Sequence, residues 1–361
     1  MTISNAKRLR VDGGQEVISE INGRAGIISL NQPTTLNALT RSMNEKISAS
    51  LKSWLNDDRV ELVILDHVPG SRGFCSGCDA PSLVTMGKSN IRKAQCFLAD
   101  QQKLIHFIAN YPKPCVAIID GVTAGSGAGL STLASHQIAT ENTLFALPET
   151  GMGWFPGCGA TWFLPKLEGE LGTWLALTGA RLRGEDVVAV GLASHFCGAE
   201  EVATMKDGLC RRGVEALGYA KTRFEFSLQD KRSEMDEAFS GDSILDILRR
   251  LKSGSQWAKA QATKIEAKSP LSVRIALRLL RTGEYLGSLQ DGLKIEYRIG
   301  SRLLHCRNFY EGVRATLIDK DHDPYWRPAG LRSVTFDMVA PYFRPLDKKE
   351  LRLSALNSVI Q

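Results

Sequence analysis

The stretch Val116-Ala-Ile-Ile-Asp-Gly-Val-Thr-Ala-Gly-Ser-Gly-Ala-Gly-Leu130 contains a strand, a glycine turn and the start of a helix in immediate succession. Its first four residues are apolar and three of them are β-branched, which is typical of a buried strand. Glycine permits backbone dihedrals that other residues avoid, so the turn can bring backbone N–H groups close to a ligand. The N-terminus of the following helix adds positive potential at the same place. This stretch therefore predicts a sheet covered by helices, with a ligand site at a strand-to-helix turn.

The same alternation extends outward on both sides of this stretch. From residue 16 to about residue 199, β-rich runs such as 26–30 and 61–65 alternate with helical stretches. Residues 42–55 carry Met43 and Ile47 at helical spacing, with charged residues on the other face, and so predict an amphipathic crossover helix. We expect an α/β fold.

The β-rich runs end after about residue 218, and the last third of the chain has a helical pattern. Four helices are expected there, over residues 242–251, 256–267, 272–281 and 289–304. Ser269-Pro270 predicts the start of the third helix, with serine as its N-cap. The polar segment 219–241 is expected to be a linker or a mobile loop.

These patterns divide the chain into a core and a helical region. We expect the core over residues 16–218 and the helical region over residues 219–346. The termini, residues 1–15 and 347–361, are expected to be loosely held.

The composition is that of an ordinary globular protein. The 361 residues are 43% hydrophobic and 23% charged, which is enough for a substantial core without disulfides or metals. The net charge of +6 favours an anionic ligand, but it lacks the clustered basicity of a nucleic-acid-binding protein. No run approaches the ~18 apolar residues of a membrane span, and the first residues lack the apolar core of a secretory signal. We expect a soluble intracellular protein, cytoplasmic in a bacterium or mitochondrial in a eukaryote.

The eight cysteines are dispersed along the chain and do not form a small-domain disulfide framework, which favours a reducing compartment. Cys75-Ser-Gly-Cys78 has the spacing of half a zinc site, but no second pair follows to complete it. We predict no metal site. The six histidines show no i,i+4 pairing, and none is assigned to catalysis.

A second glycine turn, Arg72-Gly-Phe-Cys-Ser-Gly-Cys-Asp79, also lies between a β-rich run and a predicted helix. One such turn is weak evidence, because glycines also serve to pack a helix onto a strand. Neither turn matches the phosphate loop or the dinucleotide fingerprint. The two turns instead predict a pair of N–H donors directed at one oxygen.

Glu149 is a lone carboxylate in the apolar, glycine-punctuated stretch Phe145-Ala-Leu-Pro-Glu-Thr-Gly-Met-Gly-Trp-Phe-Pro-Gly-Cys-Gly159. Desolvation would raise the pKa of such a carboxylate, so that it can serve as a base near neutral pH. The alternative is a helix cap or a solvated turn residue.

Taken together and in this order, the three segments resemble the crotonase (enoyl-CoA hydratase/isomerase) superfamily, and most closely its 3-hydroxyisobutyryl-CoA hydrolase branch. Further motifs carry the resemblance from about residue 16 to residue 346: Ala176-Leu-Thr-Gly-Ala-Arg-Leu-Arg-Gly184, Gly191-Leu-Ala-Ser-His195, Ser269-Pro-Leu-Ser272, Glu296-Tyr-Arg298, Glu311-Gly-Val-Arg-Ala-Thr-Leu-Ile-Asp-Lys-Asp321 and Pro324-Tyr-Trp326. The resemblance implies a spiral of ββα units with a C-terminal helical region. It also implies a homo-oligomer, a trimer or a multiple of one, and an acyl-CoA thioester substrate whose CoA is the only coenzyme present.

The resemblance also implies roles for individual residues. The backbone N–H groups of Cys78 and Ser126 would form an oxyanion hole for the thioester carbonyl, and Glu149 would be the catalytic carboxylate. Four residues are assigned to substrate binding, the last of them at a CoA phosphate: Gly77, Gly125, Gly157 and Lys320.

The chain departs from the family pattern at three places. Hydrolases of this branch usually carry an aspartate where this chain has Gly157, and glycines where it has Cys78 and Ser126. Hydratases need a second glutamate where this chain has Gly129, so hydratase activity is not expected.

The first expectation is hydrolysis of a short 3-hydroxyacyl-CoA such as 3-hydroxyisobutyryl-CoA, a step of valine catabolism, with Glu149 as nucleophile or general base. One alternative is an isomerase with a single glutamate base. The other is a catalytically altered structural subunit of a mitochondrial ribosome, the only case in which a nucleic-acid partner is expected.

Overall fold

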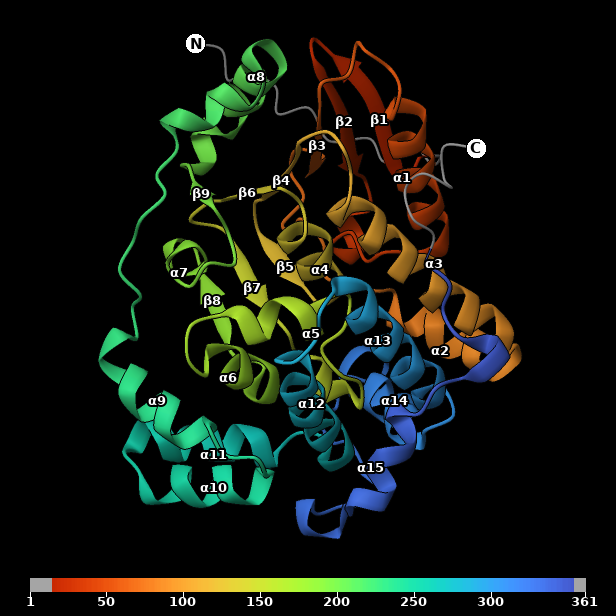
Figure 1. Ribbon diagram of the computed structural model, residues 1–361, viewed down its shortest axis with the longest axis vertical. Helices are drawn as coiled ribbons and strands as arrows, with labels where there is room; N and C mark the ends of the chain where they lie inside the picture. Colours follow the sequence, from red (N-terminus) through yellow and green to blue (C-terminus); the bar gives the residue numbers. More distant parts are fainter. Residues whose placement is uncertain (1–14, 354–361) are drawn as a thin grey trace, which may run out of the picture.

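A computed structural model describes residues 15–353 and confirms the predicted α/β fold (Figure 1). Six strands form a sheet in the order β1-β2-β3-β4-β6-β9, in which only the β1 and β2 pair is antiparallel. The strands are β1 (Val17–Asn22), β2 (Ala25–Leu30), β3 (Leu62–His67), β4 (Cys115–Ile119), β6 (His136–Ala139) and β9 (His195–Phe196). The β-rich runs expected around residues 26–30, 61–65 and 114–119 correspond to β2, β3 and β4.

A second, smaller sheet has the order β5-β7-β8, formed by β5 (Val122–Ala124), β7 (Leu144–Ala146) and β8 (Arg181–Arg183). The chain passes from the larger sheet to the smaller one twice in the same way, from β4 to β5 and from β6 to β7. Gly121, with φ +83°, makes the first of these bends, and an added Cβ there would lie 2.4 Å from the Arg72 carbonyl oxygen. A helix follows each strand pair, which gives the spiral of ββα units that the resemblance implies.

Helices cover both faces of the larger sheet. Alternate side chains of β4 point to opposite faces, as the period of a strand requires. Val116 and Ile118 pack in a cluster with Leu209 of α8 (Val202–Arg212). Ala117 and Ile119 belong to the main core, which includes apolar residues of α1 (Arg41–Trp54) and α3 (Ile91–Ala109). The remaining helices of this half are α2 (Ala80–Ser89), α4 (Ser126–Thr132), α5 (Ala160–Phe163), α6 (Leu171–Thr178) and α7 (Glu185–Ala189).

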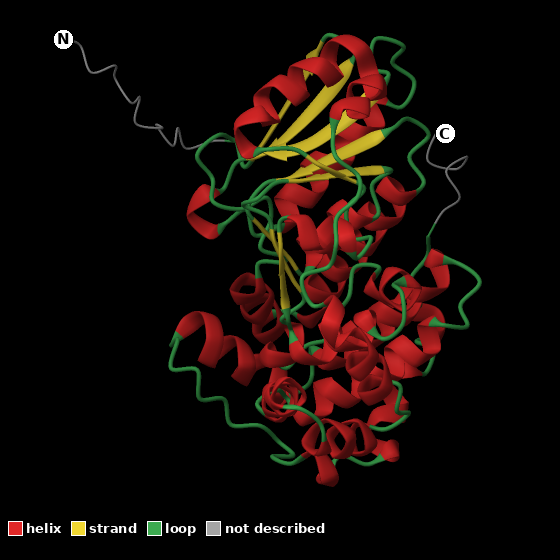
Figure 2. Ribbon diagram, turned by 90° about the vertical axis from the view of Figure 1, so that its left-hand side faces the viewer, coloured by secondary structure: helices red, strands yellow, loops and turns green. Residues whose placement is uncertain are grey.

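The helical region lies at the end of the molecule opposite the larger sheet (Figure 2). It consists of α9 (Arg232–Phe239), α10 (Ile244–Ser253), α11 (Gln256–Glu266), α12 (Pro270–Gly283), α13 (Leu289–Leu303), α14 (Arg307–Val313) and α15 (Phe336–Phe343). All four predicted helices are present, as α10 to α13. Ser269 caps α12 as predicted, since its side chain accepts a hydrogen bond from the Ser272 N–H.

Two segments differ from the expectation. The segment 219–241 was expected to be a linker or a mobile loop, but its second half forms α9, because Met235 and Phe239 bury one face of that helix in the main core. Residues 347–353, expected to be loose, are packed instead: Leu351 is buried and Glu350 pairs with Arg298 at 2.9 Å. The expectations for residues 1–14 and 354–361 lie outside the described residues. Within residues 15–353 no helix is long and apolar enough to cross a membrane.

Candidate active site

The two glycine turns lie side by side, although about fifty residues separate them in the sequence. Cys75 pairs with Thr123 as in a parallel sheet, and the Ala124 N–H donates to the Cys75 carbonyl at 2.9 Å. Gly77 has φ +109°, and a Cβ added there would lie 3.4 Å from the Ser126 amide nitrogen. The structure therefore brings Gly77, Gly125 and the predicted donor Ser126 together, as the sequence suggested.

The two predicted N–H donors, Cys78 and Ser126, have no acceptor in the part of the chain that the structure describes. Within residues 15–353, neither the Cys78 amide nor the Ser126 amide donates a hydrogen bond to a protein group. The Asp79 N–H, one residue beyond Cys78, donates instead to the Leu39 carbonyl. Ser126 is the first residue of α4, where a helix has no internal acceptor for the N–H group. Two adjacent turns with unused donors have the makeup of an oxyanion hole.

Glu149 lies against these turns. It follows β7 and opens the 3-10 helix η2 (Glu149–Met152), and its side chain is buried, with the residue 7% exposed. Its Oε1 lies 3.3 Å from the position of a Cβ added to Gly125. Its Oε2 is buried without a hydrogen-bond partner among the described residues. This burial shows that the alternative of a solvated turn residue is wrong. It also raises the pKa of Glu149 to about 8.

Two polar side chains that sequence reasoning did not select fix the Ser126 hydroxyl. Gln101 of α3 donates its Nε2–H to the Ser126 Oγ at 2.8 Å, and the Cys158 thiol donates to the same oxygen at 3.3 Å. The only sequence signal for Gln101 was a polar residue on the buried face of a helix. Burial raises the pKa of Cys158 well above that of an ordinary thiol, so it is a hydrogen-bond donor and not a nucleophile.

Glu296 of α13 is a second buried carboxylate, 1% exposed, which sequence reasoning noted only as part of a family motif. It accepts hydrogen bonds from the backbone N–H groups of Gly159 and Thr161 at the start of α5. The residue lies more than a hundred positions from the other site residues, so no local pattern could have placed it there.

The two positions that distinguish the family's activities have opposite steric properties. A Cβ added to Gly129 would lie 2.1 Å from the Cys158 carbonyl oxygen, so no glutamate fits there without moving the backbone. A Cβ added to Gly157 would meet Phe155 at 3.4 Å and the Glu296 Oε2 at 3.9 Å, which are ordinary contacts. The second carboxylate of a hydratase is therefore sterically excluded, whereas the aspartate of a hydrolase is absent but would fit.

Lys320 is exposed in the loop after the π-helix at Arg314–Ile318, with a left-handed φ of +58°. No hydrogen bond or ion pair among the described residues joins its side chain to the Glu149 cluster, so its role at a CoA phosphate stays a prediction.

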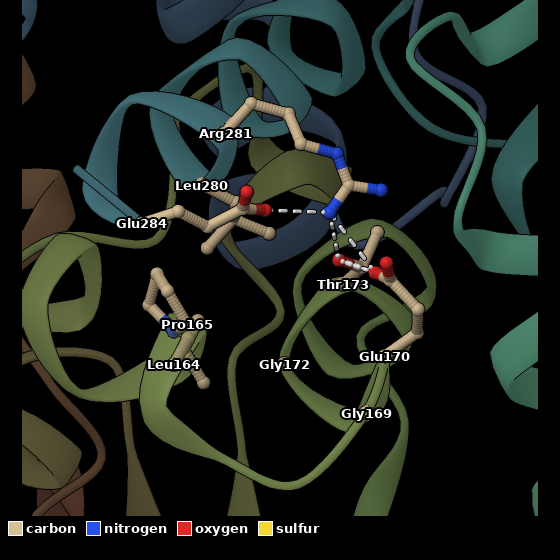
Figure 3. Close-up of a pocket in the computed structure, with 9 residues that line it drawn as sticks. All are labelled: Leu164, Pro165, Gly169, Glu170, Gly172, Thr173, Leu280, Arg281 and Glu284. Atoms are coloured by element: carbon tan, nitrogen blue, oxygen red, sulfur yellow. Dashed lines mark hydrogen bonds and ion pairs between the residues drawn. The ribbon is translucent and has the colours of Figure 1, made fainter.

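A separate cavity of about 210 Å³ lies between α6 and α12 (Figure 3). The guanidinium of Arg281 lines this cavity and points between Glu170 and Glu284. It pairs with Glu170 at 3.0 Å and with Glu284 at 2.9 Å. These three charged side chains sum to one negative charge, so the cavity does not favour an anionic ligand such as a CoA phosphate. The eight cysteines, all among the described residues, are free thiols. No group of three potential metal ligands occurs within residues 15–353.

Comparison with known proteins gives consistent results. The model of the family described as enoyl-CoA hydratase/isomerase matches residues 25–343. The chain is 38% identical over 354 residues to the mitochondrial 3-hydroxyisobutyryl-CoA hydrolase of Danio rerio, covering 94% of this chain and 92% of that protein. It is 36% identical to the enzyme of the same name from Homo sapiens, with the same coverage. A solved carnitinyl-CoA dehydratase from Mycobacterium thermoresistibile has a TM-score of 0.90 at 34% identity, covering 94% of this chain and 99% of that one. A solved enoyl-CoA hydratase from Rhodobacter sphaeroides has a TM-score of 0.87 at 33% identity, covering 94% and 100%.

Proposed function

The chain belongs to the enoyl-CoA hydratase/isomerase family, and we propose that it is an acyl-CoA thioester hydrolase acting on a short 3-hydroxyacyl-CoA such as 3-hydroxyisobutyryl-CoA. The observation that carries this proposal is the buried Glu149 carboxylate beside two unused backbone donors. The relatives named 3-hydroxyisobutyryl-CoA hydrolase support the acyl group. Their names also support a place in valine catabolism and, for a eukaryotic source, a mitochondrial location.

The reaction consumes water and releases a carboxylic acid and free CoA thiol. In one route, Glu149 takes a proton from water while the water oxygen bonds to the thioester carbonyl carbon. In the other route, Glu149 attacks that carbon itself, giving a mixed anhydride that water then opens. In both routes the carbonyl oxygen gains negative charge between the Cys78 and Ser126 amides, and the C–S bond breaks to release the CoA thiolate, which is then protonated. One such donor is typically worth about 2.7–4 kcal/mol of transition-state stabilisation.

The proposal is tested by following free-thiol release from a panel of purified thioesters. We expect turnover of 3-hydroxyisobutyryl-CoA and 3-hydroxypropionyl-CoA. Cys78→Pro removes the N–H donor and should abolish turnover, whereas Cys78→Gly keeps the donor and should retain turnover. A fully active, folded Cys78→Pro protein would contradict the oxyanion hole. Appearance of ¹⁸O in the Glu149 carboxylate after a single turnover in H₂¹⁸O would establish the anhydride route, because the general-base route cannot place it there.

Isomerisation is the second candidate, because Gly157 leaves Glu149 without the usual aspartate beside it. A single base that shuttles a proton is sufficient for that reaction. Double-bond migration in a 3-enoyl-CoA without thiol release would favour it over hydrolysis. The buried base and the unused donors support either enzyme over a structural ribosomal subunit; co-sedimentation of the protein with ribosomal particles would favour the latter.

No cofactor is proposed beyond the CoA of the substrate. A homo-oligomer, a trimer or a multiple of one, remains a proposal drawn from the family. Analytical ultracentrifugation of the purified protein tests it, and a monomer at micromolar concentration would contradict it.

A further inference from the structure

We infer that Glu296 is a positioning residue of the thioester site: from α13 it holds the loop 157–161 against Ser126 and places a second negative charge beside Glu149. The inference rests on the proposed hydrolase function and goes beyond it, because it gives the C-terminal helical region a part in the chemistry. It is carried by the contacts of one carboxylate.

Glu296 is bound almost entirely to one short segment. Its Oε1 accepts hydrogen bonds from the Thr161 N–H at 3.0 Å and from the Thr161 hydroxyl at 2.7 Å. The Gly159 N–H donates to both carboxylate oxygens, at 3.1 Å and 2.9 Å. Three donors from one segment, on a carboxylate 1% exposed, fix that segment far more strongly than a solvated pair would.

The segment needs such support because its backbone is unusual. Cys158 and Gly159 both have left-handed conformations, with φ +56° and φ +92°. A left-handed backbone is uncommon for a residue with a side chain, and it persists where its surroundings enforce it. The hydrogen bonds of Glu296 begin at the second of these two residues.

Cys158 transmits this constraint to the oxyanion donors. Its thiol donates to the Ser126 Oγ, and its carbonyl oxygen packs on Gly129 of α4, 2.1 Å from where a Cβ would be. Moving Cys158 would therefore move the first turn of α4, which carries the Ser126 N–H. Glu296 thus acts on the reacting atoms through the loop and not by touching substrate.

The same carboxylate faces the position at which hydrolases of this branch carry aspartate. The Glu296 Oε2 lies 3.9 Å from the Cβ position of Gly157 and accepts a hydrogen bond from the Gly159 N–H. This oxygen retains capacity to accept another hydrogen bond on that side. In this chain α13 therefore presents a carboxylate oxygen to the side-chain position at which the family pattern has aspartate.

The charge of Glu296 also helps to keep Glu149 basic. Burial is the main cause of the raised pKa of Glu149, and the negative charge of Glu296 adds to it. Other titratable groups near the two carboxylates include the thiols of Cys78 and Cys158, and burial raises the pKa of both, so that they stay neutral. Lys268 also reaches this region: its Nζ lies 3.4 Å from the Cβ position of Gly151 in η2, and burial lowers its pKa. Burial raises the pKa of Glu296 as well, but the donors at Gly159 and Thr161 oppose that shift because they stabilise its charged form. We therefore expect the titration of Glu149 to respond to the charge of Glu296.

The test compares three variants of the full chain, each checked for an unchanged circular dichroism spectrum. Glu296→Gln removes the charge and offers an N–H where the Gly159 N–H needs an acceptor. We expect kcat to fall roughly 10- to 100-fold, as for a small displacement of catalytic groups. The midpoint of the base in the kcat/KM profile should fall as well, because the negative charge of Glu296 raises the pKa of Glu149. Thiol release from 3-hydroxyisobutyryl-CoA supplies both values.

The other two variants separate position from charge. Thr161→Val removes one donor to Glu296 but keeps its charge, so kcat should fall less and the midpoint should not move down. Glu296→Asp keeps the charge but draws it back from Gly159, so kcat should fall while the midpoint stays near its original value. A folded Glu296→Gln protein with unchanged kcat and unchanged midpoint would overturn the inference. If Glu296→Gln does not fold, an undiminished kcat in Glu296→Asp would overturn it equally.

A readout without turnover keeps the two proposals distinguishable. The Glu149 carboxyl can be titrated by ¹³C NMR in the free protein, with Glu149→Gln identifying its signal. Glu296→Gln should lower the observed pKa of Glu149 even if no thioester is hydrolysed. If the protein hydrolyses no thioester but shows this shift, the proposed function is refuted, whereas the effect of the Glu296 charge on the pKa of Glu149 (the charge relation) is confirmed. An unshifted Glu149 signal overturns the charge relation, whatever the activity.

Discussion

Glu149 combines two properties that a purely structural residue avoids. Its carboxylate is buried, and its Oε2 has no hydrogen-bond partner among the described residues. An unpaired buried charge is expensive, so such a group takes up a proton unless a ligand or a water supplies what the protein does not. A strongly perturbed carboxylate beside two unused donors therefore supports the proposal that Glu149 is a catalytic base.

The first prediction concerns Glu149→Gln. The variant keeps the shape but cannot accept a proton, so turnover should fall by about 10²- to 10⁴-fold, the usual contribution of a general base. Because burial raises the pKa of Glu149 to about 8, hydrolysis by the parent protein should rise with pH through that value. Thiol release measured from pH 6 to 9.5 tests both expectations. Equal turnover by the two proteins would remove Glu149 from the mechanism.

The raised pKa of Glu149 also predicts how the stability of the protein depends on pH. The folded state holds a proton on Glu149 more tightly than the unfolded chain does, because the pKa is about 8 in the folded protein and near 4.5 in the unfolded chain. Glu149 therefore contributes fully to the free energy of unfolding below pH 4.5, and this contribution is lost as the pH rises through about 8. Glu149→Gln should therefore melt higher than the parent at pH 8.5, and this advantage should shrink toward pH 5. Thermal unfolding at several pH values measures it, and a constant difference would contradict the shift.

Gly157→Asp tests whether the missing aspartate limits the chemistry. The Cβ position is sterically open, so the variant should fold, and its new carboxylate would lie near Glu296. If the protein is a weakened 3-hydroxyacyl-CoA hydrolase, turnover of 3-hydroxyisobutyryl-CoA should increase several-fold, with its pH midpoint raised by like-charge repulsion. Gly157→Asn is the control of matched shape without charge. Unaltered or lower hydrolysis in a well-folded Gly157→Asp protein would mean that the hydrolase resemblance records ancestry and not present chemistry.

The glycines of α4 let this helix lie directly on backbone. Added Cβ atoms at Gly127 and Gly129 would come within 2.3 Å and 2.1 Å of the carbonyl oxygens of Cys75 and Cys158. The helix is only seven residues long, so its place is set by these contacts and not by its own stability.

We predict that Gly129→Ala destabilises the fold by about 1–3 kcal/mol or more, as overpacking in a rigid core does. It should also reduce turnover, because relieving the clash moves the first turn of α4. Gly218→Ala is the control, since an added Cβ there meets nothing within 4 Å. The denaturant unfolding midpoints of the Gly129→Ala and Gly218→Ala proteins test this prediction. Equal midpoints would show that the loop at Cys158 moves away from the added methyl group at no cost in stability.

The local elements could be predicted from sequence wherever one pattern dominated. The β-rich runs, the N-cap at Ser269 and the two glycine turns were found because their signals lie within a few residues. The helix α9 was missed because its eight residues are mostly polar, and tertiary burial of Met235 and Phe239 decides it. Gln101 and Glu296 were missed as site residues because they reach the site from 25 and 137 positions away, a convergence that no spacing reveals.

The helical region contributes residues to the proposed active site as well as covering the core. Glu296 of α13 holds the loop beside Ser126, and Ser269 before α12 donates its N–H to the carbonyl of Thr150, next to Glu149. The predicted division into residues 16–218 and 219–346 describes a change of secondary structure. The site itself draws on both parts.

Arg281 bonds to groups both in the core, residues 16–218, and in the helical region, residues 219–346. The last prediction concerns this residue. From α12 it pairs with Glu170, at the start of α6 (Figure 3). It also donates to the carbonyl oxygens of Phe239, the last residue of α9, and of Gly241. Arg281→Met keeps most of the apolar stem but leaves Glu170 and two carbonyls without this partner, which should cost about 2–3 kcal/mol. Arg249→Met, at an exposed pair, should be near neutral.

The prediction extends beyond global stability because Arg281 contacts the end of α9 directly. Loss of its bonds should raise amide hydrogen exchange in α9 and α10 more than in the larger sheet, since those helices would open before the core unfolds. Thioester turnover by the folded variant should fall only slightly even though the free energy of unfolding falls, because the contacts of Glu296 lie on α13 and stay in place. Uniform acceleration of exchange across the whole chain would show instead that core and helical region unfold as one unit, with Arg281 adding only to the total.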